Sequence, residues 1–116
     1  MKELDVKQIS SLLVGTGLAC EISASSDNNR AFVKVQVIEN QKYLNSQDKN
    51  VAHFFLRKYE VPADYIENDW DVTDEVLIGS VHIIGIKGIK QLVFHLNMYV
   101  DDLSSLVGEW KCDNPL

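Results

Sequence analysis

Hydrophobic residues recur along the chain with a period that changes from stretch to stretch, and these periods predict the elements of the fold. Over residues 4–14, apolar side chains recur every three or four positions, which is the spacing of one helical face. Residues 18–25 and 31–39 read as two strands around a polar turn, the second with clear apolar and polar alternation, which predicts a β-hairpin. From residue 46 to 59 the spacing is helical again, and this second helix is expected to end before Pro62.

The second half of the chain predicts another hairpin, although part of it fits two structures. Residues 75–86 and 91–100 place apolar and mixed side chains on opposite faces in a register that sets His82 against His95. Residues 89–106 also carry apolar side chains at helical spacing. A long helix over that range is therefore the alternative that stays open here.

A last helix is expected over residues 103–110, with Asp101 or Asp102 as its cap. The order is then helix, two strands, helix, two strands, helix, which predicts an α+β fold. We expect a single domain over residues 1–116, with an antiparallel sheet of about four strands, in two hairpins, packed with about three helices.

The charge balance limits the kind of partner that the chain can bind. Its 11 Lys and Arg face 17 Asp and Glu, so the formal net charge is −6, which argues against a nucleic-acid partner. No stretch reaches the ~18 consecutive apolar residues of a membrane span. Two cysteines are too few for the disulfide framework of a small secreted domain. The sequence therefore predicts a cytoplasmic protein without a membrane or nucleic-acid partner.

Residues with catalytic or metal-binding chemistry are sparse. Residues 99–102 spell YVDD, which resembles the metal-binding tetrad of reverse transcriptases, but the chain is short and acidic, and the end of a strand followed by a helix cap explains the same letters. His82 and His95 offer two imidazoles without a recognisable third ligand, so a solvent-facing or interface pair is the preferred interpretation. We expect no enzyme, no catalytic residue, no cofactor and no bound metal.

One segment differs from the rest of the chain in its charge. Between Tyr59 and Ile86 the sequence has no Lys or Arg but seven acids, all within sixteen consecutive positions. Aromatic side chains are interleaved with them, and aromatic residues anchor protein interfaces while carboxylates steer a basic partner. The alternative is a solvated loop with its tryptophan in the core. The candidate partner-binding residues are Glu60, Asp64, Tyr65, Glu67, Asp69, Trp70, Asp71, Asp74 and Glu75.

In its size, its acidity and the stretch EVPADYIENDWDVTDE, the chain resembles the small acidic immunity proteins that bacteria pair with toxic nucleases, including those of contact-dependent growth inhibition. The resemblance implies an antitoxin that binds and neutralises a cognate toxin, which we expect to be a basic nuclease domain. An acidic aromatic surface would then occupy the basic groove in which the nuclease holds its substrate.

A type III secretion chaperone is the alternative function. Such chaperones are also small, acidic and α+β, and they bind an extended effector segment as dimers through apolar grooves. A homodimer is compatible with both functions. The two hypotheses therefore differ in which surface binds the partner.

Overall fold

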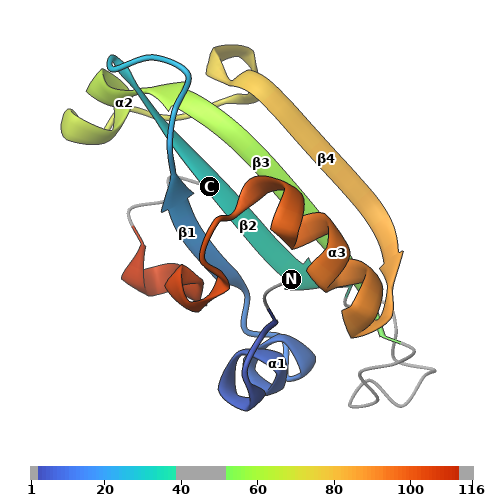
Figure 1. The fold of residues 1–116 in the computed structure, drawn as a ribbon. Coiled ribbons are helices and arrows are strands. Elements are labelled where there is room, and N and C mark those ends of the chain that lie inside the picture. Colours follow the sequence, from blue (N-terminus) through green and yellow to red (C-terminus); the bar gives the residue numbers. More distant parts are fainter. Residues whose placement is uncertain (1–2, 39–51, 113–116) are drawn as a thin grey trace.

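The structure, a computed structural model, describes residues 3–38 and 52–112 and contains one antiparallel sheet with helices packed against it (Figure 1). The strands lie in the order β4-β3-β2-β1-β5. The predicted α+β fold class is confirmed, with one strand more than the hydrophobic pattern predicts. The strands are β1 (Leu18–Ile22), β2 (Asn29–Val37), β3 (His53–Pro62), β4 (Ile78–Lys87) and β5 (Val107–Gly108). The helices are α1 (Val6–Leu13), α2 (Ala63–Glu67) and α3 (Gly88–Tyr99), with 3₁₀ turns η1 (Asp74–Val76), η2 (Leu103–Ser105) and η3 (Glu109–Lys111).

Helix α1 forms where the sequence predicts it, because its two ends carry the appropriate residues. The Asp5 carboxylate accepts a hydrogen bond from the Gln8 N–H at 2.8 Å, and the Asp5 N–H donates to the Gln8 side chain at 2.9 Å. Gly15, with a φ of 94°, follows the helix. The Gln8 amide also donates to the carbonyl oxygens of Leu103 at 2.7 Å and Leu106 at 3.0 Å. These bonds fasten α1 to the C-terminal part of the chain.

The first predicted hairpin is confirmed as β1 and β2. The two strands pair antiparallel, with Leu18 opposite Val35. Val33 and Val35 are fully buried on one face of the sheet. On the other face, the Arg30 guanidinium and the Glu21 carboxylate form an ion pair at 2.7 Å. The alternation of apolar and polar residues in this hairpin thus predicts correctly which side chains lie on each face.

The middle helix predicted from the sequence is wrong, because its described part is strand β3. Residues 46–51 lie outside the described residues, whereas His53–Pro62 pairs with β2 on one side and with β4 on the other. Phe54 and Leu56 are fully buried on one face, and Tyr59 is fully buried on the opposite face. A central strand covered on both faces loses its simple alternation, and its bulky residues then imitate helical spacing.

The second predicted hairpin is also wrong, because its second half is a helix. Strand β4 takes the first half as predicted, whereas residues 91–99 lie in α3. The alternative helical interpretation is correct for this part, although the helix ends at Tyr99 and does not continue to residue 106. His82 and His95 therefore lie on different elements and do not face each other across a hairpin.

Two glycines interrupt the alternation of β4. Its register with β3 shifts at two places, and Gly79 (φ 59°) and Gly85 (φ 80°) lie there. A left-handed backbone is common at β-bulges, and glycine adopts it without steric strain. As a result, Ile83 and Ile86 both pack toward the main core, whereas an unbroken strand would direct them to opposite faces.

The prediction of a C-terminal helix is also wrong. Residues 103–110 form the turn η2, the strand β5 and the start of η3, and Gly108 pairs with the edge of the sheet at β1. Leu103 and Leu106 are buried, as their spacing suggests, but Trp110 is 73% exposed. The expected cap is present on the shorter turn, because the Asp102 carboxylate accepts from the Ser104 N–H at 3.1 Å.

Helices α1 and α3 pack against one face of the sheet, and a smaller apolar cluster lies on the other face (Figure 1). The main core between sheet and helices includes Leu12, Val33, Val35, Phe54, Leu56, Leu92, Leu96 and Leu103. The cluster on the opposite face consists of Phe32, Tyr59 and Val61. This second cluster positions the candidate site, because the acidic part of the chain covers it.

Candidate functional site

The acidic segment, defined here as residues 63–77, begins as the chain leaves β3 at Pro62. Helix α2 follows directly and ends at Glu67, and Asn68 caps it with a backbone N–H that donates to the Asp64 carbonyl at 3.0 Å. Asp69 then takes a left-handed backbone with a φ of 53°. This reversal lets the Trp70 N–H donate to the Tyr65 carbonyl at 2.9 Å. Asp tolerates this conformation better than most residues, so the local sequence explains the turn.

The underside of the acidic segment is apolar and holds it against the sheet. Five of its side chains pack against the second cluster, in which the rings of Phe32 and Tyr59 lie 5.7 Å apart. The segment is therefore anchored through buried apolar contacts, which stabilise the folded state by removing apolar area from water. The anchoring side chains are Tyr65, Ile66, Val72, Val76 and Leu77.

The outer side of the acidic segment presents an aromatic pair. The rings of Tyr65 and Trp70 meet edge to face, with centroids 5.3 Å apart and planes at 87°. Tyr65 is half-buried, whereas Trp70 is 53% exposed. The interpretation of Trp70 as a core residue is therefore wrong. An indole held in one orientation by a neighbouring ring loses little freedom when a partner covers it.

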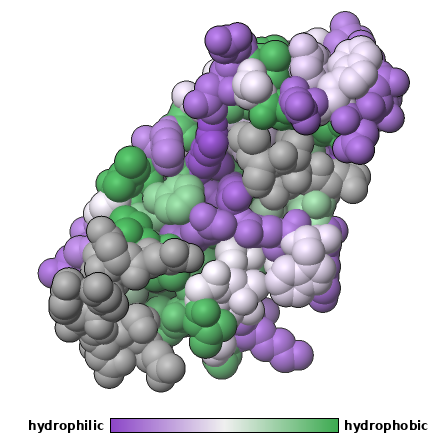
Figure 2. Space-filling view, turned by 180° about the vertical axis from the view of Figure 1, so that it is seen from behind, coloured by the Kyte–Doolittle hydropathy of each residue, from purple (hydrophilic) through white to green (hydrophobic). Residues whose placement is uncertain are grey.

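Exposed carboxylates surround this aromatic pair. Within the described residues, the side chains of Asp64, Glu67, Asp69, Asp71 and Glu75 are exposed, and none of them takes part in a hydrogen bond or an ion pair. Figure 2 shows hydrophilic residues gathered around near-neutral ones at the end of the molecule where Figure 1 draws α2. We call Tyr65, Trp70 and these carboxylates the acidic aromatic surface.

Asp74 differs from the other acids because it has a cation as its neighbour. Its carboxylate lies 2.7 Å from an Nη of Arg57, whose side chain is 21% exposed, whereas that of Asp74 is 87% exposed. The pair joins η1 to β3 and fixes the end of the acidic segment. Its exposure to solvent limits its contribution to stability to about 1 kcal/mol or less. Asp74 thus serves the fold as well as the charge of the surface.

Glu60 does not belong to the acidic aromatic surface, so its prediction as a partner-binding residue is not supported by its position. It lies on β3 and is only 5% exposed. Its carboxylate accepts hydrogen bonds from the Ser25 N–H at 3.1 Å, the Ser25 hydroxyl at 2.9 Å and the Asn29 amide at 3.4 Å. Burial raises the pKa of Glu60, but these hydrogen bonds and the nearby charge of Lys58 outweigh it, so the pKa is lowered.

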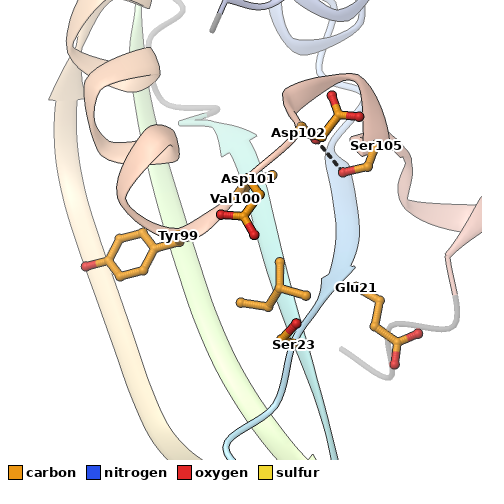
Figure 3. Close-up of a pocket in the computed structure, with 8 residues that line it drawn as sticks. Glu21, Ser23, Tyr99, Val100, Asp101, Asp102 and Ser105 are labelled. Atoms are coloured by element: carbon orange, nitrogen blue, oxygen red, sulfur yellow. Dashed lines mark hydrogen bonds between the residues drawn. The ribbon is translucent and has the colours of Figure 1, made fainter. Parts of the chain in front are cut away.

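A cavity that the sequence reasoning missed lies between the end of β1 and the turn after α3 (Figure 3). Its volume is about 570 Å³. In Figure 3 the side chains of Tyr99 and Glu21 extend to opposite sides, and the Ser105 hydroxyl donates to the Asp102 carbonyl at 2.6 Å. Its walls come from stretches about eighty residues apart in sequence, so local sequence pattern does not predict it, although the YVDD stretch at residues 99–102 forms part of its lining. The lining includes Glu21, Ile22, Ser23, Tyr99, Asp101 and Ser105.

The histidines do not form a metal centre in the part of the chain that the structure describes. His82 meets the ring of Phe55 edge to face at 5.5 Å, and His95 meets that of Phe94 at 5.6 Å. No group of three or more His, Cys, Asp or Glu side chains able to hold a metal ion occurs among residues 3–38 and 52–112. The acidic aromatic surface therefore stands as the candidate site.

Comparison of the chain with protein-family models, with curated proteins and with solved structures found no match. Within the described ranges, no helix has both the length and the apolar character needed to cross a membrane.

Proposed function

We propose that this chain is a protein-binding domain that recognises a basic partner through the acidic aromatic surface, and that it acts as the immunity protein of a bacterial nuclease toxin. One observation carries the proposal: exposed carboxylates without partners surround a half-exposed tryptophan on a segment that is anchored from below. Charge alone keeps many loops soluble. Single exposed apolar side chains are also common, but Trp70 is held edge to face by Tyr65 within the acidic segment, and this combination of a fixed aromatic pair with unpaired carboxylates is typical of a binding surface.

The two kinds of side chain have different tasks in this proposal. Carboxylates exposed to solvent raise the rate of encounter with a basic protein, to above ~10⁶ M⁻¹s⁻¹, but each adds little to the final affinity. Trp70 supplies the affinity, because tryptophan is enriched among the residues that dominate binding energy. Its ring face also attracts the guanidinium and ammonium groups that a basic partner presents.

An immunity protein is proposed because an acidic surface can block the site at which a basic nuclease binds its substrate. A nuclease holds the phosphates of its substrate in a cationic groove, and an acidic surface with an aromatic ring offers that groove the charge and the stacking of a nucleic acid. Binding there blocks the substrate without any catalysis by this chain. The cytoplasm, where such a toxin would act on nucleic acid, is the proposed compartment.

The experiment that tests this function is capture of the partner from a lysate of the source cell, at low and at high salt, with mass spectrometry of the retained proteins. We expect one basic protein, retained less well at high salt because ions screen exposed charges. The W70A bait should retain it at least about 30-fold less well, as expected for a dominant interface residue.

The matched control is the W110A bait, because Trp110 is 73% exposed but lies on η3, outside the acidic segment. It should capture as much partner as the wild-type chain. Capture of an apolar, partly unfolded client that does not respond to salt would favour the chaperone alternative and contradict the proposal.

A further inference from the structure

Strand β4 is an edge of the sheet, and its outer backbone groups have no strand beside them among the described elements. The Ile38 N–H donates to the carbonyl of His53 at 2.9 Å, so His53 bonds toward β2. Because successive residues of a strand direct their backbone N–H and C=O groups to opposite sides, those of Phe54, Leu56 and Lys58 point toward β4. Their partners include Ile83 and Val81, which leaves the N–H and C=O groups of residues 80, 82 and 84 directed outward.

This edge has two bulges, but it lacks the charged side chains and prolines by which proteins also protect a free strand. From Ile78 to Ile86 there is no charged residue and no proline. The side chain of Ile84 is 69% exposed, and that of Ile78 is 42% exposed. The two glycine bulges lie near the ends of β4 and leave residues 81–83 in unbroken register. The middle of β4 is therefore ready to accept another strand.

Helix α3 adds apolar surface beside this edge. It packs over β4 and β3, and it exposes Phe94 (52%) and Met98 (56%), which are one helical turn apart. A twofold axis through the edge, perpendicular to the sheet, would place two copies of α3 on the same face as neighbours.

We propose that a second copy of this chain pairs with β4 along its free edge, antiparallel about a twofold axis near His82, so that two five-stranded sheets become one continuous sheet. The distribution of charge favours a second copy as the occupant. An isologous interface must be complementary to itself, and the chain carries a net charge of −6, so most of its surface repels a second copy.

The charges at the two ends of β4 are opposite, which makes this edge complementary to itself. Glu75 lies just before the strand and Lys87 is its last residue, and both are exposed. Antiparallel pairing brings Lys87 of one copy toward Glu75 of the other, twice per dimer. The uncharged middle of the strand adds no repulsion between the copies.

Sedimentation velocity from about 1 to about 300 μM tests this dimer, because association depends on concentration. We expect wild-type dimers, and an I84K variant whose dissociation constant is raised at least about tenfold, because a lysine on an edge strand disfavours pairing with another strand. The V6K variant is the matched control, because Val6 lies on α1 and is 79% exposed. It should dimerise like the wild type.

Exchange of the charges at positions 75 and 87 tests the twofold arrangement, because these variants leave the middle of β4 unchanged. E75K and K87E should each weaken the dimer about threefold or more, and the double variant E75K/K87E should restore it, because each altered position meets the other across the axis. Monomers at every concentration, dimers that I84K leaves unchanged, or no recovery in the double variant would overturn the proposal.

Discussion

At the scale of single residues, Glu60 shows how one carboxylate can serve the fold while its neighbours in sequence serve the surface. It accepts hydrogen bonds from Ser25 and Asn29, and so it holds the loop between β1 and β2 against β3. The next acid along the chain, Asp64, is exposed on α2. A strand directs Glu60 into the protein, and the helix that follows directs Asp64 out of it.

The lowered pKa of Glu60 predicts how stability depends on pH. The ionised carboxylate stabilises the folded state fully above the ordinary glutamate value of 4.5, and this contribution is lost as the pH falls through the lowered pKa. The E60Q variant should lose about 1 kcal/mol of unfolding free energy at pH 7, the difference between charged and neutral hydrogen bonds. Urea titrations at pH 7 and at about pH 3 measure this.

The difference between E60Q and the wild type should become smaller at the acidic pH, because below pH 4.5 the carboxyl of the unfolded wild-type chain takes up a proton, which favours the unfolded state. The E67Q variant, at an exposed position, is the control, and its unfolding free energy should stay within about 0.5 kcal/mol of the wild type at both pH values. A constant difference between E60Q and the wild type across the pH range would contradict the assigned charge state.

At the scale of elements, strand β4 owes its shape to two backbone positions. Gly85, at a φ of 80°, allows a bulge after which Ile86 faces the main core together with Ile83. A side chain at position 85 would meet open space, so only the backbone conformation opposes one. A substitution at position 85 therefore changes the free energy of the bulged backbone without a change in side-chain packing.

Replacement of this glycine tests the bulge directly. G85A should lower the unfolding free energy by about 1 to 2 kcal/mol, the cost of a left-handed backbone for a residue with a Cβ. S80A, on the same exposed strand but without a positive φ, should change it by less than about 0.5 kcal/mol. Equal stability of G85A and S80A in thermal denaturation would argue against the bulge.

The elements that the sequence predicts correctly are those with local signals. A capping box starts α1, and alternation marks β1 and β2, because these features depend on residues close in sequence. The spacing of β3 misleads, since Phe54, Leu56 and Tyr59 are buried on two faces by elements far along the chain. The apolar residues of α3 fit both periods, and only packing on the sheet decides between strand and helix.

The candidate site likewise has one part that the sequence predicts and another that it does not. Its acids and aromatic residues are predictable, because they lie close together in one short segment. The pairing of Asp74 with Arg57 and the burial of Glu60 are not, because both depend on β3 being a strand. The cavity beside Tyr99 depends on contact between the two ends of the chain, for which local pattern has no signal.

At the scale of the whole molecule, the two ends of β4 carry opposite charges. The acidic segment precedes β4, and Lys87 and Lys90 lie after nine further residues of extended strand, about 30 Å away. A basic partner is therefore drawn to one end of the molecule. The edge of β4 lies between the two ends, so the proposed dimer engages Glu75 but leaves the other residues of the acidic aromatic surface accessible.

The most direct test of the central claim is the affinity of the captured partner for two variants with equal charge. E67K/D71K reverses two exposed acids of the acidic aromatic surface and spares Asp69, whose backbone disfavours lysine. E3K/D101K makes the same change in net charge at two exposed positions elsewhere. At low salt we expect E67K/D71K to weaken binding about tenfold, because the association rate falls and the new lysines repel a basic partner, and E3K/D101K to weaken it less than about threefold. Equal affinities of the two variants would contradict the assignment of the site.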